Sequence, residues 1–228
     1  MNVLVVAAHP DDEVLGCGGA IAKHIYQEDK VHILILAEGA TSRIRERDRN
    51  QFQSELSALE ISAHQAGKIL GINSLYLHDF PDNRMDGCDL LDIVKVIEKA
   101  IVQHHPQIVY THHHGDVNID HRLTHEAVVT ACRPLPNHPV HTLLFFEVPS
   151  STEWQTAGSA LPFIPNWFID ISETLALKLK ALEAYESEMR SYPHPRSLEA
   201  VEYLARWRGA TVGVLAAEAF ILGRNLVK

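Results

Sequence analysis

The sequence predicts a three-layer α/β/α fold around a mostly parallel sheet, with an elaborated C-terminal third. Short β-branched runs alternate with amphipathic helical patterns over the first two-thirds of the 228-residue chain, an alternation typical of parallel sheets with helical crossovers. The hydrophobic fraction of 46% is ordinary for a packed core. After Pro149 the alternation stops. The length therefore favours one domain, residues 1–228, rather than two.

Five short apolar runs predict the parallel strands. They are Val3–Ala8, Val31–Ala37, Ser74–His78, Ile108–Thr111 and Thr142–Val148. The first run, VLVVAA, is continuously apolar, which is typical of a strand buried on both faces. A doubly wound sheet arranges such strands in the order 3-2-1-4-5. The first and fourth strands should therefore be neighbours.

Helical patterns separate these strands. They cover Gly18–Glu28, about Arg45 to Leu70, Asp89–His104 and Asp120–Cys132. The second is the clearest, because its apolar residues recur every three or four positions. These residues are Phe52, Leu56, Leu59, Ala63, Ala66 and Leu70. Gly71 follows and favours a helix end there.

The C-terminal third predicts a different organisation. Residues 149–166 are rich in serine, threonine and proline and predict a long functional loop. A short strand over Trp167–Asp170 and helices over Ser172–Glu188 and Ser197–Arg208 should follow. The terminal segment Ala217–Phe220 allows two interpretations. It either returns to the functional site or forms a plain edge segment.

Composition excludes several classes of protein. Twenty basic and 29 acidic residues leave a net charge of −9, which argues against non-specific nucleic-acid binding. Three widely spaced cysteines, Cys17, Cys88 and Cys132, argue against a disulfide framework. No apolar stretch approaches the ~18 residues of a membrane span, and the first apolar run is too short for a signal peptide. We therefore expect a cytoplasmic protein.

The strongest functional signal is AHPDDE, residues 8–13, directly after the first predicted strand. Ligands of parallel sheets bind outside the carboxyl ends of the strands. His9 and Asp12 can turn toward one point, and an imidazole with a carboxylate suits Zn²⁺ or Fe²⁺. Asp11 lies between them and can stay uncoordinated, as a general base must. The alternative is a helix N-terminus decorated with acidic residues.

A second polar segment, THHHGDVNIDHR over residues 111–122, follows the fourth predicted strand. Because the first and fourth strands should be neighbours, the two segments should meet in space. His121 would then complete a site of two histidines and one carboxylate with open positions. Asp120 can instead be the N-cap of the next helix. At most one or two of the residues 112–114 can face a site.

Together, AHPDDE and NIDHR resemble the LmbE/PIG-L superfamily of metal-dependent N-deacetylases, and the resemblance covers most of the chain. It implies a Rossmann-like fold and the removal of acetyl from N-acetylglucosamine-type conjugates. It also implies His9, Asp12 and His121 as metal ligands and Asp11 as the catalytic base. The resemblance favours zinc, although this ligand set suits Fe²⁺ as well.

One position departs from the family pattern. Many members carry a histidine three residues before the last ligand, where it stabilises the oxyanion, whereas this chain has Asn118. An amide can donate a hydrogen bond to an oxyanion but cannot act as a charged acid. Either the metal and Asn118 share that role, or a histidine from elsewhere, His113 or His194, supplies it.

Further side chains that follow predicted strands or occupy a rigid two-proline turn are candidates for substrate binding. They are Arg43, Asn83, Glu147, His194 and Arg196. The resemblance suggests that Arg43 binds substrate hydroxyls or a phosphate, and Glu147 is placed to hold sugar hydroxyls. The alternatives are a solvated arginine at position 43 and a plain turn at position 83.

The leading hypothesis is a zinc-dependent hydrolase that removes the N-acetyl group from an amino sugar, a small-molecule substrate. One alternative is an amidase acting on a larger acyl group or a thiol–sugar conjugate. Another is a metal-dependent sugar-binding protein without turnover. The run GCGG at residues 16–19 does not match G-x-G-x-x-G and argues against a dinucleotide. A homo-oligomer stays open, because Phe220, Ile221 and Leu222 can face a partner or finish the core.

Overall fold

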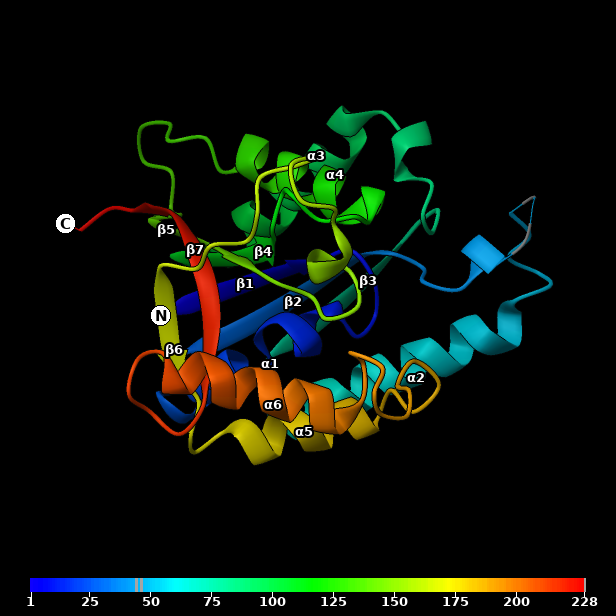
Figure 1. The fold of residues 1–228 in the computed structure, drawn as a ribbon. Coiled ribbons are helices and arrows are strands. Elements are labelled where there is room, and N and C mark those ends of the chain that lie inside the picture. Colours follow the sequence, from blue (N-terminus) through cyan, green and yellow to red (C-terminus); the bar gives the residue numbers. More distant parts are fainter. Residues whose placement is uncertain (44, 46, 228) are drawn as a thin grey trace.

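One mixed sheet organises the molecule. The structure is a computed structural model that describes residues 1–43, 45 and 47–227, without the side chain of Arg43. Within these residues the strand order is β3-β2-β1-β4-β5-β7-β6 (Figure 1). The strands are β1 Asn2–Ala7, β2 Lys30–Ala37, β3 Ser74–Phe80, β4 Ile108–His112, β5 Thr142–Phe146, β6 Trp167–Asp170 and β7 Ala217–Asn225. The first five are parallel, which confirms the predicted order 3-2-1-4-5.

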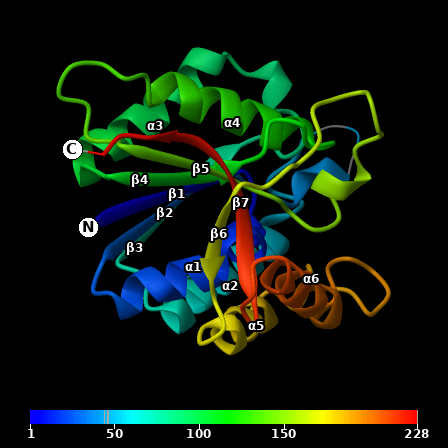
Figure 2. The ribbon, with the colours of Figure 1, turned by 60° about the vertical axis from the view of Figure 1, so that its left-hand side comes forward.

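Helices cover both faces of the sheet, as the sequence predicts. They are α1 Asp12–Tyr26, α2 Gln53–Leu70, α3 Leu90–His104, α4 Ile119–Ala131, α5 Leu175–Glu183 and α6 Leu198–Ala210. Figures 1 and 2 show α3 and α4 on one face and the other four on the opposite face. Helix α5 packs on α1 and α2, so the C-terminal third adds to the layer that α1 begins.

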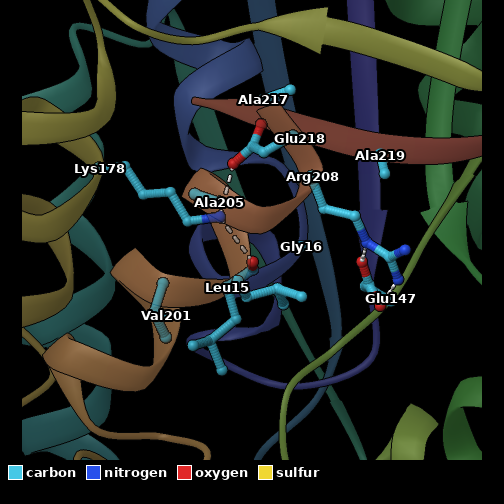
Figure 3. Close-up of a pocket in the computed structure, with 11 residues that line it drawn as sticks. Leu15, Gly16, Glu147, Lys178, Val201, Ala205, Arg208, Ala217, Glu218 and Ala219 are labelled. Atoms are coloured by element: carbon cyan, nitrogen blue, oxygen red, sulfur yellow. Dashed lines mark hydrogen bonds and ion pairs between the residues drawn. The ribbon is translucent and has the colours of Figure 1, made fainter. Parts of the chain in front are cut away.

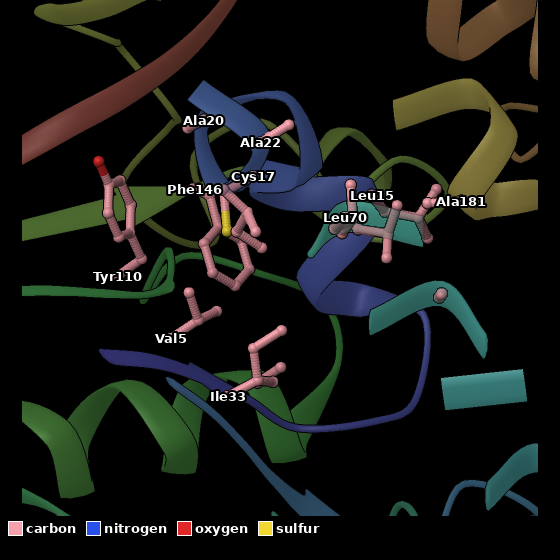
Figure 4. Close-up of a cluster of buried hydrophobic side chains, with 14 of the residues drawn as sticks. Val5, Leu15, Cys17, Ala20, Ala22, Ile33, Leu70, Tyr110, Phe146 and Ala181 are labelled. Carbon is pink, nitrogen blue, oxygen red and sulfur yellow. The ribbon is translucent and has the colours of Figure 1, made fainter. Parts of the chain in front are cut away.

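The central strand β1 divides the core in two. Val3, Val5 and Ala7 pack with α1 and α2 in one cluster (Figure 4). Leu4 and Val6 pack with α3 and α4 in the other. Because successive side chains of a strand point to opposite faces, a strand buried on both sides is apolar at every position. This is the physical reason for the continuous run VLVVAA.

Strand β7 corrects one expectation. The segment Ala217–Phe220 does not form an edge of the sheet, because β7 lies between β5 and β6 and runs antiparallel to both. The four-residue strand β6 is the edge. Phe220 is fully buried, with its ring centroid 5.3 Å from that of Tyr110, so it finishes the core.

Three helices differ from their predicted bounds. Helix α1 begins at Asp12 rather than Gly18, and it bends at Cys17, whose φ is −148° and ψ 24°. Helix α2 begins at Gln53 rather than at about Arg45. In the segment before it, Arg47 and Arg49 bind the carboxylate of Glu38, which directly follows β2. Helix α5 ends at Glu183, before the predicted Glu188.

The bend in α1 fits two tight contacts. A Cβ at Gly16 would lie 2.3 Å from the ring of Phe146, and one at Gly19 would lie 2.8 Å from Ile171. The helix can therefore approach β5 and the segment after β6 only where it has no side chains.

A buried ion pair replaces the hydrogen bond that the bend removes. In a regular helix the Gly19 N–H would donate to the Leu15 carbonyl. Here Lys178 Nζ donates to the Leu15 carbonyl at 2.8 Å, and the Glu218 carboxylate accepts from Gly19 N at 2.9 Å and Ala20 N at 2.7 Å. Lys178 and Glu218 also bind each other at 2.6 Å (Figure 3). Two residues of the C-terminal third thus provide hydrogen-bond partners for the backbone groups that the bend in α1 leaves unpaired.

The described helices include none that is long and apolar enough to cross a lipid bilayer. Cys17, Cys88 and Cys132 are free thiols, as their spacing predicts.

We expect Glu218→Gln to lower the free energy of unfolding by about 3–5 kcal/mol, because it leaves the Lys178 ammonium buried without a compensating charge. Urea denaturation followed by circular dichroism measures this change. The matched control is Glu98→Gln, whose partner Lys95 is exposed, and it should change stability by less than about 0.5 kcal/mol. Equal effects of the two substitutions would contradict the assigned role of the buried pair.

Candidate active site

The segments after β1 and β4 meet at the carboxyl end of the sheet, because these two strands are neighbours. His9 and Asp12 come from the first segment and from the start of α1, and His121 comes from the first turn of α4. Each offers one ligand atom, and the three atoms lie within 4.8 Å of one another. A second group of the same kind consists of His9, Asp82 and Asp120.

In each histidine of the first group, one ring nitrogen faces Asp12 and is called the inner nitrogen. The other, outer nitrogen contacts a second carboxylate. His9 Nε2 lies 3.0 Å from Asp120 Oδ2, and His121 Nδ1 lies 3.2 Å from Asp116 Oδ2. The inner nitrogens, His9 Nδ1 and His121 Nε2, lie 3.3 Å and 3.2 Å from Asp12 Oδ2. When the outer nitrogens carry the protons, the inner lone pairs converge on one place. Metal-binding histidines have this arrangement.

Two buried atoms at this place need a partner. Among the described residues Asp12 Oδ1 has no hydrogen-bond partner, and His121 Nε2, although 3.2 Å from Asp12 Oδ2, makes no hydrogen bond of good geometry. Unsatisfied buried polar atoms are costly, and a bound ion or water is the usual explanation. Two imidazole nitrogens with one carboxylate are a donor set that suits Zn²⁺ and Fe²⁺. The first group therefore fits a divalent cation.

Asp120, a member of the second group, is less suited to bind a metal ion. Its Oδ2 accepts from Asn83 N at 2.6 Å and its Oδ1 from Met85 N at 3.0 Å, in addition to its contact with His9. Both oxygens are thus engaged in holding the turn after β3. Asp120 connects this turn to His9.

The carboxylates also determine the charge of the histidines. Burial lowers the pKa of His9, but hydrogen bonds with Asp12, Asp120 and Asp82 raise it well above its usual value. Burial likewise lowers the pKa of His121, and the charges of Asp12 and Asp116 outweigh it and raise that pKa to about 9. The surrounding carboxylates therefore favour positive charge at this place, either as protons on the two rings or as a bound cation that replaces the protons on the inner nitrogens.

Sequence reasoning missed Asp116. Its Oδ1 accepts from Asn118 N at 2.8 Å and from the Ser151 hydroxyl, and its Oδ2 accepts from Thr152 Oγ1 at 2.7 Å. Burial raises the pKa of Asp116, but its bonds with His121 and these hydroxyls hold it well below its usual value. The available signal was an aspartate within the polar segment after β4, five positions before His121.

Asp11 lies beside this group and does not belong to it. Its φ of 103° is in the left-handed region, which is strained for a residue with a side chain. The strain is compatible with the start of α1, because the Asp11 carbonyl accepts from Val14 N and Leu15 N. Arg196 Nη1 binds Asp11 Oδ2 at 2.8 Å. Burial raises the pKa of Asp11 to about 7, against the opposing charge of Arg196.

Glu13 supports the loop between β1 and α1 through two hydrogen bonds. Its carboxylate accepts from Asp11 N at 3.1 Å and from the Tyr185 hydroxyl at 2.6 Å. Burial raises the pKa of Glu13 to about 8, although the bond from Tyr185 lowers it. Glu13 thus supports the position of Asp11 and, unlike Asp12, belongs to neither candidate metal group.

One of the three consecutive histidines faces the site. The ring of His112 stacks on that of His121 with centroids 4.0 Å apart, and its Nε2 accepts from Ala8 N at 2.8 Å. Burial lowers the pKa of His112 well below its usual value, so the ring is neutral. His113 instead donates to the Leu161 carbonyl at 3.0 Å, and His114 is exposed.

The interpretation of Asp120 as a helix cap is wrong. Asn118 caps α4, because its Oδ1 accepts from Asp120 N at 2.8 Å. Its Nδ2 donates to Asn83 Oδ1 at 3.0 Å. Asn83, in the turn after β3, is therefore next to the site.

The other substrate-binding candidates lie at different places. Arg196 binds Ser150 Oγ through Nε as well as Asp11. His194 Nδ1 accepts from Arg196 N and thus shapes that turn. Glu147 forms a two-point ion pair with Arg208 (Figure 3). The side chain of Arg43 lies outside the described residues.

Residues 4–132 match the family model described as PIG-L: GlcNAc-PI de-N-acetylase. The chain belongs to the PIG-L family. The resemblance inferred from AHPDDE and NIDHR is thus confirmed. Among PIG-L relatives, the diacetylchitobiose deacetylase of Thermococcus kodakarensis is 31% identical over 197 residues, which cover 82% of this chain and 70% of that protein.

Solved structures share the PIG-L fold seen here. The conserved protein TT1542 from Thermus thermophilus superposes with a TM-score of 0.76 at 25% identity, covering 99% of this chain and 96% of that one. GalB, the 4-carboxy-2-hydroxymuconate hydratase from Pseudomonas putida, has a TM-score of 0.76 at 24% identity, covering 100% and 98%. Because a hydratase has this fold, the reaction must be argued from the site.

The two candidate groups share His9, so substitutions outside it distinguish them. We expect His121→Ala to weaken Zn²⁺ binding by more than about 100-fold, because it removes a direct ligand rather than a supporting partner. Asp82→Asn, which removes an oxygen from the second group alone, should weaken binding far less. Equilibrium dialysis with Zn²⁺ measures both, and circular dichroism checks the fold. The reverse order would assign the ion to the second group.

Proposed function

We propose that residues 1–228 act as one domain that removes the acetyl group from an N-acetylated amino sugar with the help of a bound metal ion. One observation carries this proposal. Two imidazole nitrogens and a carboxylate converge with buried, unpartnered atoms, and a separate carboxylate, Asp11, lies beside them. Membership of the PIG-L family supports the same reaction.

His9, Asp12 and His121 would hold the ion, and we propose zinc. When bound, it would lower the pKa of a water toward ~7 and polarise the acetyl carbonyl. Asp120 and Asp116 would keep the two histidines in the correct tautomer and orientation through the outer nitrogens. His112 would hold the ring of His121 from one side.

Asp11 is assigned the proton transfers. Arg196 fixes the orientation of its carboxylate, and this carboxylate takes the proton of the attacking water. The new carbon–oxygen bond forms as the carbonyl becomes an oxyanion, and the carbon–nitrogen bond then breaks. Asp11 returns its proton to the leaving nitrogen. The products are acetate and the free amine.

We propose Asn118 as the second donor to the oxyanion. Its Nδ2 donates to Asn83 Oδ1, so the substrate must take over this bond. His113 is a poorer candidate, because its Nε2 is bound to the Leu161 carbonyl. His194 has its Nδ1 bound to Arg196 N.

Substrate contacts are proposed for the side chains around this centre. Asn83 is exposed next to Asp82, and Arg196 and His194 form the turn beside Asp11. Glu147 lines a pocket beside the 149–166 loop, and Arg43 is still proposed, from the family resemblance, to contact hydroxyls or a phosphate. A larger acyl group, a thiol–sugar conjugate and binding without turnover are the alternatives against which the next experiment tests deacetylation.

We expect Asp11→Asn to reduce acetate release by about 10²–10⁴-fold, the usual contribution of a positioned general base, and to retain the metal ion. Acetate release is measured with zinc-reconstituted protein on a panel of N-acetylglucosamine conjugates. Metal content is measured by atomic emission on the same samples. The matched control is Asp86→Asn, an exposed aspartate that should leave turnover unchanged.

Full activity of Asp11→Asn would remove Asp11 from its assigned role. Absence of acetate release by the wild-type protein with one bound metal would favour a different acyl group or binding without turnover.

A further inference from the structure

A hollow lined largely by the 149–166 loop lies beside the candidate active site, and we call it the loop pocket. Its volume is about 350 Å³, within the range of small-molecule sites. It adjoins the candidate active site through Asp116. Gly115, which lines the pocket, immediately precedes Asp116, and Thr152, also in its wall, donates to Asp116 Oδ2 at 2.7 Å. The same Asp116 oxygen lies 3.2 Å from His121 Nδ1.

The charges that line the loop pocket sum to a negative value. They are the carboxylates of Glu147 and Glu153 and the guanidinium of Arg208. Arg208 binds both oxygens of Glu147, with Nε at 2.8 Å and Nη2 at 2.7 Å. A guanidinium binds phosphate or carboxylate through this same two-point geometry. Glu147 thus neutralises the charge of Arg208 and occupies its Nε–Nη2 edge, which leaves an anionic ligand only the Nη1 edge in a pocket of net negative charge.

The rest of the lining suits a sugar ring. Phe163, Leu161 and Pro162 supply an apolar wall, and Gln155 and Thr156 supply neutral polar groups. Pockets of this composition bind one face of a ring by apolar contact and its rim by a few hydrogen bonds. Carboxylates such as Glu147 and Glu153 accept hydrogen bonds from hydroxyl groups.

We propose that the loop pocket binds an uncharged polyhydroxylated ring attached to the N-acetylated sugar, and that Glu147 excludes anionic conjugates by neutralising Arg208. The inference rests on the proposed function and names its substrate class. The substrate would be an uncharged N-acetylated oligosaccharide or glycoside, rather than a phosphorylated or carboxylated conjugate.

The experiment compares an uncharged with an anionic ligand in two readouts. N,N′-diacetylchitobiose and N-acetylglucosamine 1-phosphate are the substrates for acetate release. Cellobiose and glucose 1-phosphate, which carry no amino group, are the ligands for calorimetric binding to the zinc-loaded protein. We expect the wild-type protein to prefer the uncharged member of each pair by at least about tenfold.

Glu147→Gln should change this preference, because it releases the Arg208 guanidinium to bind an anion. We expect the affinity and kcat/KM for the anionic member to rise by about tenfold. The double variant Glu147→Gln/Arg208→Gln lacks the freed cation and should show no such rise. Glu98→Gln, in an exposed pair elsewhere on the chain, is the matched control and should keep the wild-type ratio.

The outcomes separate the two proposals. Acetate release with a wild-type preference for the anionic substrate would overturn the inference and leave the proposed function intact. Binding of cellobiose with the expected effect of Glu147→Gln, but without acetate release from either substrate, would support the pocket and overturn the deacetylase. If neither ligand binds, or if Glu147→Gln leaves the ratio unchanged, the inference is wrong. Should Glu147→Gln unfold, the double variant decides: the pocket proposal requires it to bind cellobiose without binding glucose 1-phosphate.

Discussion

Two histidines from different parts of the chain converge on one buried carboxylate, Asp12, and this convergence is the constraint on which the rest of the site depends. It requires neighbouring strands, since His9 follows β1 and His121 follows β4. It also requires fixed tautomers, which Asp120 and Asp116 supply from outside. Each of these aspartates in turn holds a loop, so that the site and the loops around it are one network.

The C-terminal third completes what the parallel sheet begins. Helix α1 carries Asp12 in its first turn and bends shortly afterwards, where Phe146 leaves no room for a side chain on Gly16. Lys178 and Glu218 satisfy the backbone groups that the bend frees. Tyr185 and Arg196 reach the same loop and bind the carboxylates next to Asp12. Four residues of the late elements thus bind the first motif or the helix that follows it.

Charge pairing distinguishes the inner site from the loop pocket. Around His9 and His121 the carboxylates outnumber the cations, and the pKa of both histidines rises in response. In the loop pocket the one guanidinium, that of Arg208, is bound by Glu147. The first arrangement favours a metal ion and the second an uncharged ligand. The fold alone dictates neither, because a hydratase has the same architecture.

The sequence by itself determined the strand order, the layers and the position of the two polar motifs, because hydrophobic periodicity and motifs at strand ends are local signals. It did not reveal the contacts that make the motifs into a site. Asp11 and Arg196 are 185 positions apart, and Gly19 and Glu218 are 199 positions apart. Single polar residues carry no periodicity, so Lys178 had no distinguishing pattern, and Asp116 had only its place in the polar segment after β4. Whether Asn118 or Asp120 capped α4 depended on where Asn83 and His9 lay, and only the tertiary structure decided that.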